Sequence, residues 1–98
     1  MAVMEISVVP IGTESPSVSH YVAECVGVLK KKGFSYELTS MGTNVLGELK
    51  DLLAVAQEMH ELPFQRGAQR VLTSIKIDDR RDKQLTIEGK KEAVQRQL

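Results

Sequence analysis

The stretch from Ser15 to Leu38, SPSVSHYVAECVGVLKKKGFSYEL, decides the fold because its apolar period changes within a few residues. Its first part repeats apolar residues every three or four positions, as one face of a helix requires. Serine followed by proline predicts that this helix starts at Ser15 and Pro16, and Gly33 predicts a left-handed end. Alternation of apolar and polar residues from Phe34 onward then predicts a strand with one buried face.

The segments on either side of this stretch extend the pattern. Alternation and apolar periodicity predict three further strands and two further helices. The strands are Val3–Pro10, Asn44–Glu48 and Val71–Ile77, and the helices run from Leu49 to a kink or stop near Pro63 and from Ile87 to Gln97. The order β-α-β-β-α-β with an added C-terminal helix indicates an α+β fold, a ferredoxin-like antiparallel sheet. We expect residues 1–98 to form a single domain.

The two faces of the predicted sheet differ in polarity. Right-handed crossovers place both main helices on one face, over the even-numbered residues of the first two strands. The reverse face is semi-polar, and we expect a neighbouring copy of the chain to complete it, because a 98-residue domain leaves much apolar surface uncovered. Its residues are Glu5, Ser7, Glu37, Thr39, Ser74 and Lys76, with Val9 and Leu46 among them.

Composition argues against several classes of function. The formal net charge is zero, which disfavours a nucleic-acid binder. Cys25 is the only cysteine, so no intrachain disulfide forms, and no apolar run suits a membrane span; we expect a cytoplasmic protein. His20, His60 and Cys25 lack metal-ligand spacing, and no nucleophile, P-loop or dinucleotide motif occurs. We therefore expect no metal, no cofactor and no catalytic residue.

Two polar connections converge at one edge of the predicted sheet. The first two strands run in the same direction, so the Ile11–Ser15 loop and the Ser40–Thr43 connection lie beside the start of the first helix. Hydroxyl groups and free amides there suit a ligand. Helix capping by Ser15 and turn geometry at Gly42 explain the same residues equally simply.

A run of alternating charge follows the last predicted strand. The residues are Lys76, Asp78, Asp79, Arg80, Arg81 and Asp82. One reading is a solvated turn in which the charges pair locally. The other is an interface in which the arginines bridge to carboxylates of another subunit. The sequence alone leaves both readings open.

Four segments in this order resemble the family of small thiamine-binding proteins related to YkoF. They are Ile6–Thr13, Ser17–Tyr21, Met41–Thr43 and Lys76–Asp82. The resemblance implies ferredoxin-like subunits that assemble into homodimers, often dimers of dimers (homotetramers), and bind thiamine or its hydroxymethylpyrimidine moiety without catalysis. It implies a site near a subunit interface, for which the candidate ligand-binding residues are Ser7, Thr13, Ser15, Glu37, Thr39, Met41, Gly42 and Thr43.

Two alternatives remain beside this interpretation. A small enzyme that uses the ferredoxin-like cleft would need a histidine or a carboxylate of raised pKa, and Glu5 and Glu37 are the in-sheet candidates. A structural or regulatory oligomer would need no small ligand at all.

Overall fold

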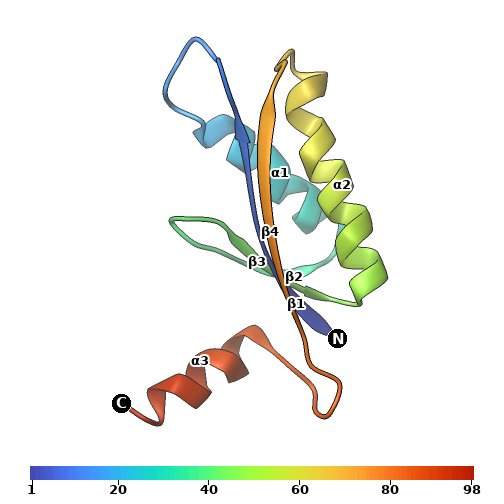
Figure 1. Cartoon of the computed structure of the whole chain (residues 1–98), viewed down its shortest axis with the longest axis vertical. Coiled ribbons are helices and arrows are strands. Elements are labelled where there is room, and N and C mark those ends of the chain that lie inside the picture. The colour runs from blue at the N-terminus through green and yellow to red at the C-terminus, as the bar shows by residue number, and fades with distance from the viewer.

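The computed structural model describes every residue from Met1 to Leu98. Four strands and three helices alternate along the chain (Figure 1). Their bounds are β1 (Ala2–Pro10), α1 (Ser19–Lys32), β2 (Ser35–Leu38), β3 (Thr43–Gly47), α2 (Leu49–Gln65), β4 (Val71–Asp79) and α3 (Ile87–Gln95). None of the helices combines the length and the apolar character that a membrane crossing needs.

The strands form one sheet in the order β2-β3-β1-β4, and every neighbouring pair is antiparallel. The central strand β1 pairs with β4 from Ala2 opposite Asp79 to Pro10 opposite Val71. In Figure 1 these two long strands run side by side through the molecule, while the β2–β3 hairpin projects to one side. This topology confirms the predicted ferredoxin-like fold, with α3 as the added C-terminal helix.

The core lies between one face of the sheet and the helices α1 and α2. Alternation along β1 sends Met4 and Ile6 to this face, and both side chains are almost fully buried. Leu29 of α1 and Leu52 of α2 meet them from above and are 0% exposed. Gly33 ends α1 in the left-handed conformation with φ of 79°, as the sequence predicts.

The start of α1 differs from the prediction. The helix begins at Ser19, its N-cap is Val18, and no side chain caps it. The Ser15 hydroxyl instead accepts a hydrogen bond from the amide of Ser17, and Thr13 donates to the Ser15 carbonyl. These local bonds turn the chain before the helix begins, because serine and threonine compete with helical bonding. Ser15 is therefore not the cap of α1.

Smaller boundary differences have local causes. Strand β3 starts at Thr43, so the turn between β2 and β3 ends one residue earlier than predicted. Helix α2 continues for two residues beyond Pro63, because a proline removes only its own donor while the helix backbone continues past it. Strand β4 extends to Asp79, so that Asp78 and Asp79 belong to the sheet and not to the loop that follows.

The third helix covers part of the reverse face of the sheet. Lys90 pairs with Asp78 of β4, and Lys91 lies 2.9 Å from a carboxylate oxygen of Glu37 on β2. The segment before the helix buries Leu85, whereas no residue within α3 is buried. Exposed ion pairs and one apolar anchor therefore hold α3, and the chain itself fills part of the face expected for a partner.

We expect α3 to detach more readily than the rest of the fold. The hydrogen bond from Lys91 lowers the pKa of Glu37, so this carboxylate favours the docked state above its ordinary pKa. That contribution is lost as the pH falls through the lowered pKa, and salt screens it at any pH. The protection factors of the amides in Ile87–Gln95, corrected for the intrinsic pH dependence of exchange, should therefore fall in acid and in high salt relative to those of α1. An equal fall in α1 and α3 would contradict this.

Candidate ligand-binding site

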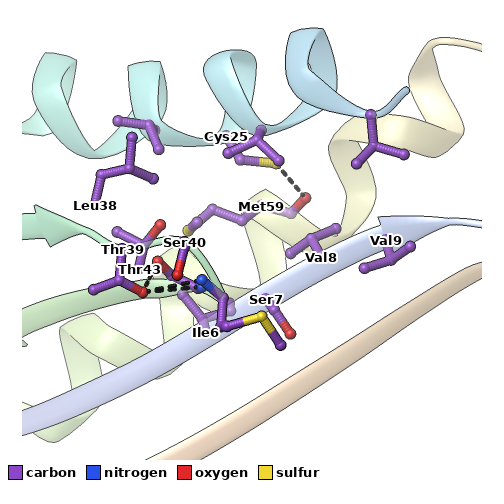
Figure 2. Close-up of a pocket in the computed structure, with 15 residues that line it drawn as sticks. Ile6, Ser7, Val8, Val9, Cys25, Leu38, Thr39, Ser40, Thr43 and Met59 are labelled. Carbon is purple, nitrogen blue, oxygen red and sulfur yellow. Dashed lines mark hydrogen bonds between the residues drawn. The ribbon is translucent and has the colours of Figure 1, made fainter. Parts of the chain in front are cut away.

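A cavity of about 320 Å³ lies between α1, the strand β1 and the β2–β3 hairpin. Pockets that bind small molecules occupy about 300–1,000 Å³, so the cavity suits a compact ligand. It lies on the helix-covered side of the sheet (Figure 2). The lining residues are Ile6, Ser7, Val8, Val9, Val18, Val22, Cys25, Val26, Leu38, Thr39, Ser40, Met41, Gly42, Thr43 and Met59.

Thr43 supplies the buried polar group of this cavity. It is opposite Ile6 in the sheet, on the face that the helices cover, and it is 4% exposed. Its hydroxyl takes part in none of the side-chain hydrogen bonds within the chain, and no buried polar atom is sealed off without a partner. Because every fully buried polar atom has a partner, the unpaired Thr43 oxygen must be reachable from the cavity, although the residue as a whole is nearly buried. The Thr43 hydroxyl is therefore available to a ligand in the cavity.

The tip of the β2–β3 hairpin forms the rim. The Thr39 hydroxyl donates to the Gly42 carbonyl at 2.8 Å and accepts the Gly42 amide at 3.1 Å, so the turn itself uses this side chain. Gly42 lies close to β1: a Cβ atom there would be 3.2 Å from the carbonyl oxygen of Ile6. Close backbone approach explains the glycine better than turn geometry alone. Thr39 therefore shapes the rim, while Thr43 remains free.

A thiol–carbonyl contact beside a proline joins the two helices at the floor of the cavity. Pro63 has no amide hydrogen, so it gives the carbonyl of Met59 no helical hydrogen bond. The thiol of Cys25, on α1, donates to that carbonyl at an Sγ–O distance of 3.6 Å, as the dashed line in Figure 2 shows. This contact links α1 to α2 beneath the cavity. Cys25 thus satisfies a polar group that the proline leaves unpaired.

Burial makes the Cys25 thiol a poor nucleophile. Desolvation, with a smaller effect of Glu24, raises its pKa from 9.0 to about 11. At pH 7 the thiolate fraction is then roughly a hundredfold below that of a free cysteine. We expect alkylation by iodoacetamide to be slower by at least that factor in the folded protein than in urea, as followed by mass spectrometry. Comparable rates in both states would contradict this.

The same shift predicts how stability depends on pH. The folded thiol keeps its proton to a higher pH than the unfolded thiol does. Its contribution is therefore intact below about pH 9 and declines as the pH rises toward 11.

The structure separates the candidate residues into three places. Thr39, Met41, Gly42 and Thr43 meet at the cavity. Ser7 borders it only through its backbone, because its side chain points to the other side of β1 (Figure 2). Thr13 and Ser15 instead line a separate polar groove of about 710 Å³ with His20, Tyr21 and the segment Arg66–Arg70. Thr13 and Ser15 therefore do not meet the hairpin, contrary to the prediction, because the first turn of α1 lies between the two hollows.

Glu37 lies at neither hollow. It points to the reverse face, where Lys91 of α3 pairs with it and lowers its pKa. A catalytic carboxylate that accepts protons near neutral pH needs the opposite shift. Glu5, the other in-sheet carboxylate, is 3.8 Å from Lys76 on the same face.

The charged run is paired within the chain. Arg80 donates two hydrogen bonds to the carboxylate of Asp82, at 2.6 and 2.9 Å, and Arg81 donates to Asp79 at 2.8 Å. These arginines lower the pKa values of Asp79 and Asp82. Lys90 forms an ion pair with Asp78, and Lys76 forms one with Glu5. The local pairing anticipated for a solvated turn is thus present.

Sequence reasoning missed most of the apolar lining. Val18, Val22, Cys25 and Val26 belong to the α1 stripe, which predicts core packing, and Met59 belongs to the α2 stripe. A stripe of this kind carries no signal that distinguishes a filled core from a core with a hollow. No group of three or more metal-ligating side chains is close enough to hold a metal ion, and His60 instead contacts the hydroxyl of Thr73 at 2.7 Å.

Fold and cavity together define a small ferredoxin-like protein with one apolar, hydroxyl-bearing hollow beneath its first helix. Residues 4–95 match the sequence pattern of the thiamine-binding protein family. The chain belongs to this family.

Similar proteins agree with that assignment. The UPF0045 protein YqgV of Bacillus subtilis is 50% identical over 102 residues, which cover 100% of this chain and 98% of YqgV. The crystal structure of hypothetical protein MJ1052 from Methanocaldococcus jannaschii has a TM-score of 0.86 at 38% identity and covers 96% of this chain and 95% of its own. A putative thiamine biosynthesis/salvage protein, TM0486 from Thermotoga maritima, has a TM-score of 0.81 at 24% identity, with 95% and 97% covered. At that identity the last comparison concerns the fold alone.

Proposed function

We propose that this chain is a non-catalytic, cytoplasmic protein that binds thiamine or a related pyrimidine such as hydroxymethylpyrimidine. The observation that carries the proposal is the hydroxyl of Thr43, which makes no hydrogen bond within the chain and opens into a mostly apolar cavity. A hydroxyl both donates and accepts hydrogen bonds, and an aminopyrimidine presents both kinds of group. Family membership supports the same class of ligand. The ligand place is the cavity under α1 rather than the reverse face of the sheet.

The lining also supports a role in binding rather than in catalysis. None of the fifteen lining residues is an aspartate, a glutamate or a histidine, so the cavity holds no ordinary general acid or base. The cationic thiazolium of thiamine finds no carboxylate there either. The pyrimidine end therefore enters the cavity, and the cation stays in water at the rim.

Titration calorimetry with thiamine and with hydroxymethylpyrimidine tests the proposal. Binding at a Kd of 1 mM corresponds to about −4 kcal/mol and is measurable at millimolar ligand. We expect saturable heat with hydroxymethylpyrimidine, which lacks the thiazolium ring. Absence of heat with both compounds at that concentration would refute the proposal.

We further propose that the protein assembles as a homodimer or a dimer of dimers, with the ligand near a subunit interface. Apolar side chains at the cavity rim support this, because Leu38 is 59% and Met41 is 84% exposed. Leu72 on the reverse face and Val94 on α3 are also exposed. The charged run is a second candidate interface, in which its arginines would pair with carboxylates of the partner subunit in place of Asp79 and Asp82. Light scattering at micromolar concentration should give a multiple of 10.9 kDa, and a monomer mass would contradict assembly.

A further inference from the structure

The cavity has sulfur-bearing residues in its lining but no aromatic or charged ones. The three sulfur-bearing residues are Cys25, Met41 and Met59, each from a different part of the fold: α1, the β2–β3 turn and α2. An aromatic ligand would therefore meet sulfur atoms where many sites offer an aromatic ring.

The sulfur-bearing residues are held in distinct ways. Met59 is 2% exposed at the floor, and its carbonyl accepts the Cys25 thiol, so α1 and α2 are fixed relative to each other there. Figure 2 shows Cys25 and Met59 extending from their helices toward the same space. Met41 is 84% exposed at the rim, on the turn that the Thr39 hydroxyl stabilises.

Sulfur in these positions favours a flat, uncharged ring. Thioethers are polarisable and make favourable contacts with aromatic rings at about 5 Å. A phosphate or other charged group would lose its hydration in this lining without gaining a partner. The Thr43 hydroxyl can meanwhile hydrogen bond with the edge of a ring that lies between the two methionines.

We propose that Met41 and Met59 bind the two sides of an uncharged heteroaromatic ring, with Cys25 as the wall between them. The proposal rests on the proposed pyrimidine-binding function and specifies how the ring is held. Specificity then resides in the sulfur contacts and the hydroxyl of Thr43.

Methyl NMR tests this directly, because an aromatic ring shifts the resonances of nearby methyl groups. Protein labelled with ¹³C at the methionine methyls contains four probes, at Met1, Met4, Met41 and Met59. On addition of hydroxymethylpyrimidine we expect upfield shifts at Met41 and Met59. Met1 and Met4 do not line the cavity and should stay unchanged. Calorimetric binding without shifts at Met41 and Met59 would overturn this inference and leave the proposed function standing; absence of heat with both hydroxymethylpyrimidine and thiamine would refute both.

Methionine-to-leucine variants provide the energetic test. Leucine conserves the volume and removes the sulfur, and such exchanges are well tolerated in cores. We expect Met41→Leu and Met59→Leu each to weaken binding of hydroxymethylpyrimidine by about twofold to tenfold. Met4→Leu, in the core away from the cavity, is the matched control and should bind like the parent. Because Met41 is exposed, its replacement leaves folding intact. Unchanged affinity in both cavity variants would contradict the inference.

Discussion

Replacing Thr43 with valine is expected to weaken pyrimidine binding by about fivefold to 150-fold without destabilising the protein. Valine has nearly the shape of threonine but lacks the hydroxyl, so a hydrogen-bonding group of the bound ligand would be left unpaired. Such a loss costs about 1–3 kcal/mol, which corresponds to that range of affinities. The free protein should keep its stability, because the Thr43 hydroxyl has no partner within the chain to lose and reaches the open cavity.

The two readouts are measured separately. Calorimetry with hydroxymethylpyrimidine gives the affinity, and urea unfolding gives the free energy of unfolding. Thr43→Ser serves as the control, because serine keeps the hydroxyl and should retain most of the affinity. Equal binding by the parent and the valine variant would remove Thr43 from the site. A large loss of stability in the valine variant would show that the hydroxyl has a structural partner.

Replacing Leu52 with alanine is expected to lower the free energy of unfolding by about 2–5 kcal/mol. This side chain is 0% exposed on α2 and packs against the end of β3. A Cβ atom at Gly47 would lie 3.3 Å from a Leu52 methyl carbon, which shows how closely the helix approaches the strand. Removing the side chain leaves a cavity that rigid backbone on both sides cannot close.

The next residue on the same helix provides the matched control. Leu53 is 50% exposed, and Leu53→Ala should change the free energy of unfolding by no more than about 0.5 kcal/mol. Urea unfolding at one protein concentration compares both variants with the parent. Equal losses in the two variants would mean that Leu53 is buried in an assembly, and repeating the measurement over a range of concentrations would reveal this.

Most of the fold can be predicted from local patterns. The stripe from Val18 to Leu29 and the left-handed residue Gly33 specify α1 and its end, and alternation specifies which face of β1 is buried. The start of α1 cannot be read in the same way. A Ser-Pro pair resembles a helix cap, but the hydroxyl bonds of Thr13 and Ser15 stabilise a turn there first.

The candidate site could be predicted only in part, because its walls are core residues. Met41, Gly42 and Thr43 stand out as a connection between strands, and the structure places them at the cavity. Val22 and Met59 look like ordinary members of apolar stripes. Whether such stripes pack without a gap depends on the distances between helices, and the spacing of apolar residues along one helix does not give those distances. Alternation correctly places Glu37 on the open face of the sheet, but it cannot show that Lys91 pairs with it there, because the position of α3 is set by long-range contacts.

The thiol–carbonyl contact beneath the cavity makes the amino acids at positions 25 and 63 interdependent. An ordinary residue in place of Pro63 would restore a helical amide as a donor to the Met59 carbonyl, so the cysteine would no longer be needed to satisfy that oxygen. Conversely, an aliphatic residue in place of Cys25 is best tolerated where position 63 is not proline, because the Met59 carbonyl then has a helical donor. We therefore expect positions 25 and 63 to covary among related sequences, although they lie far apart in the chain.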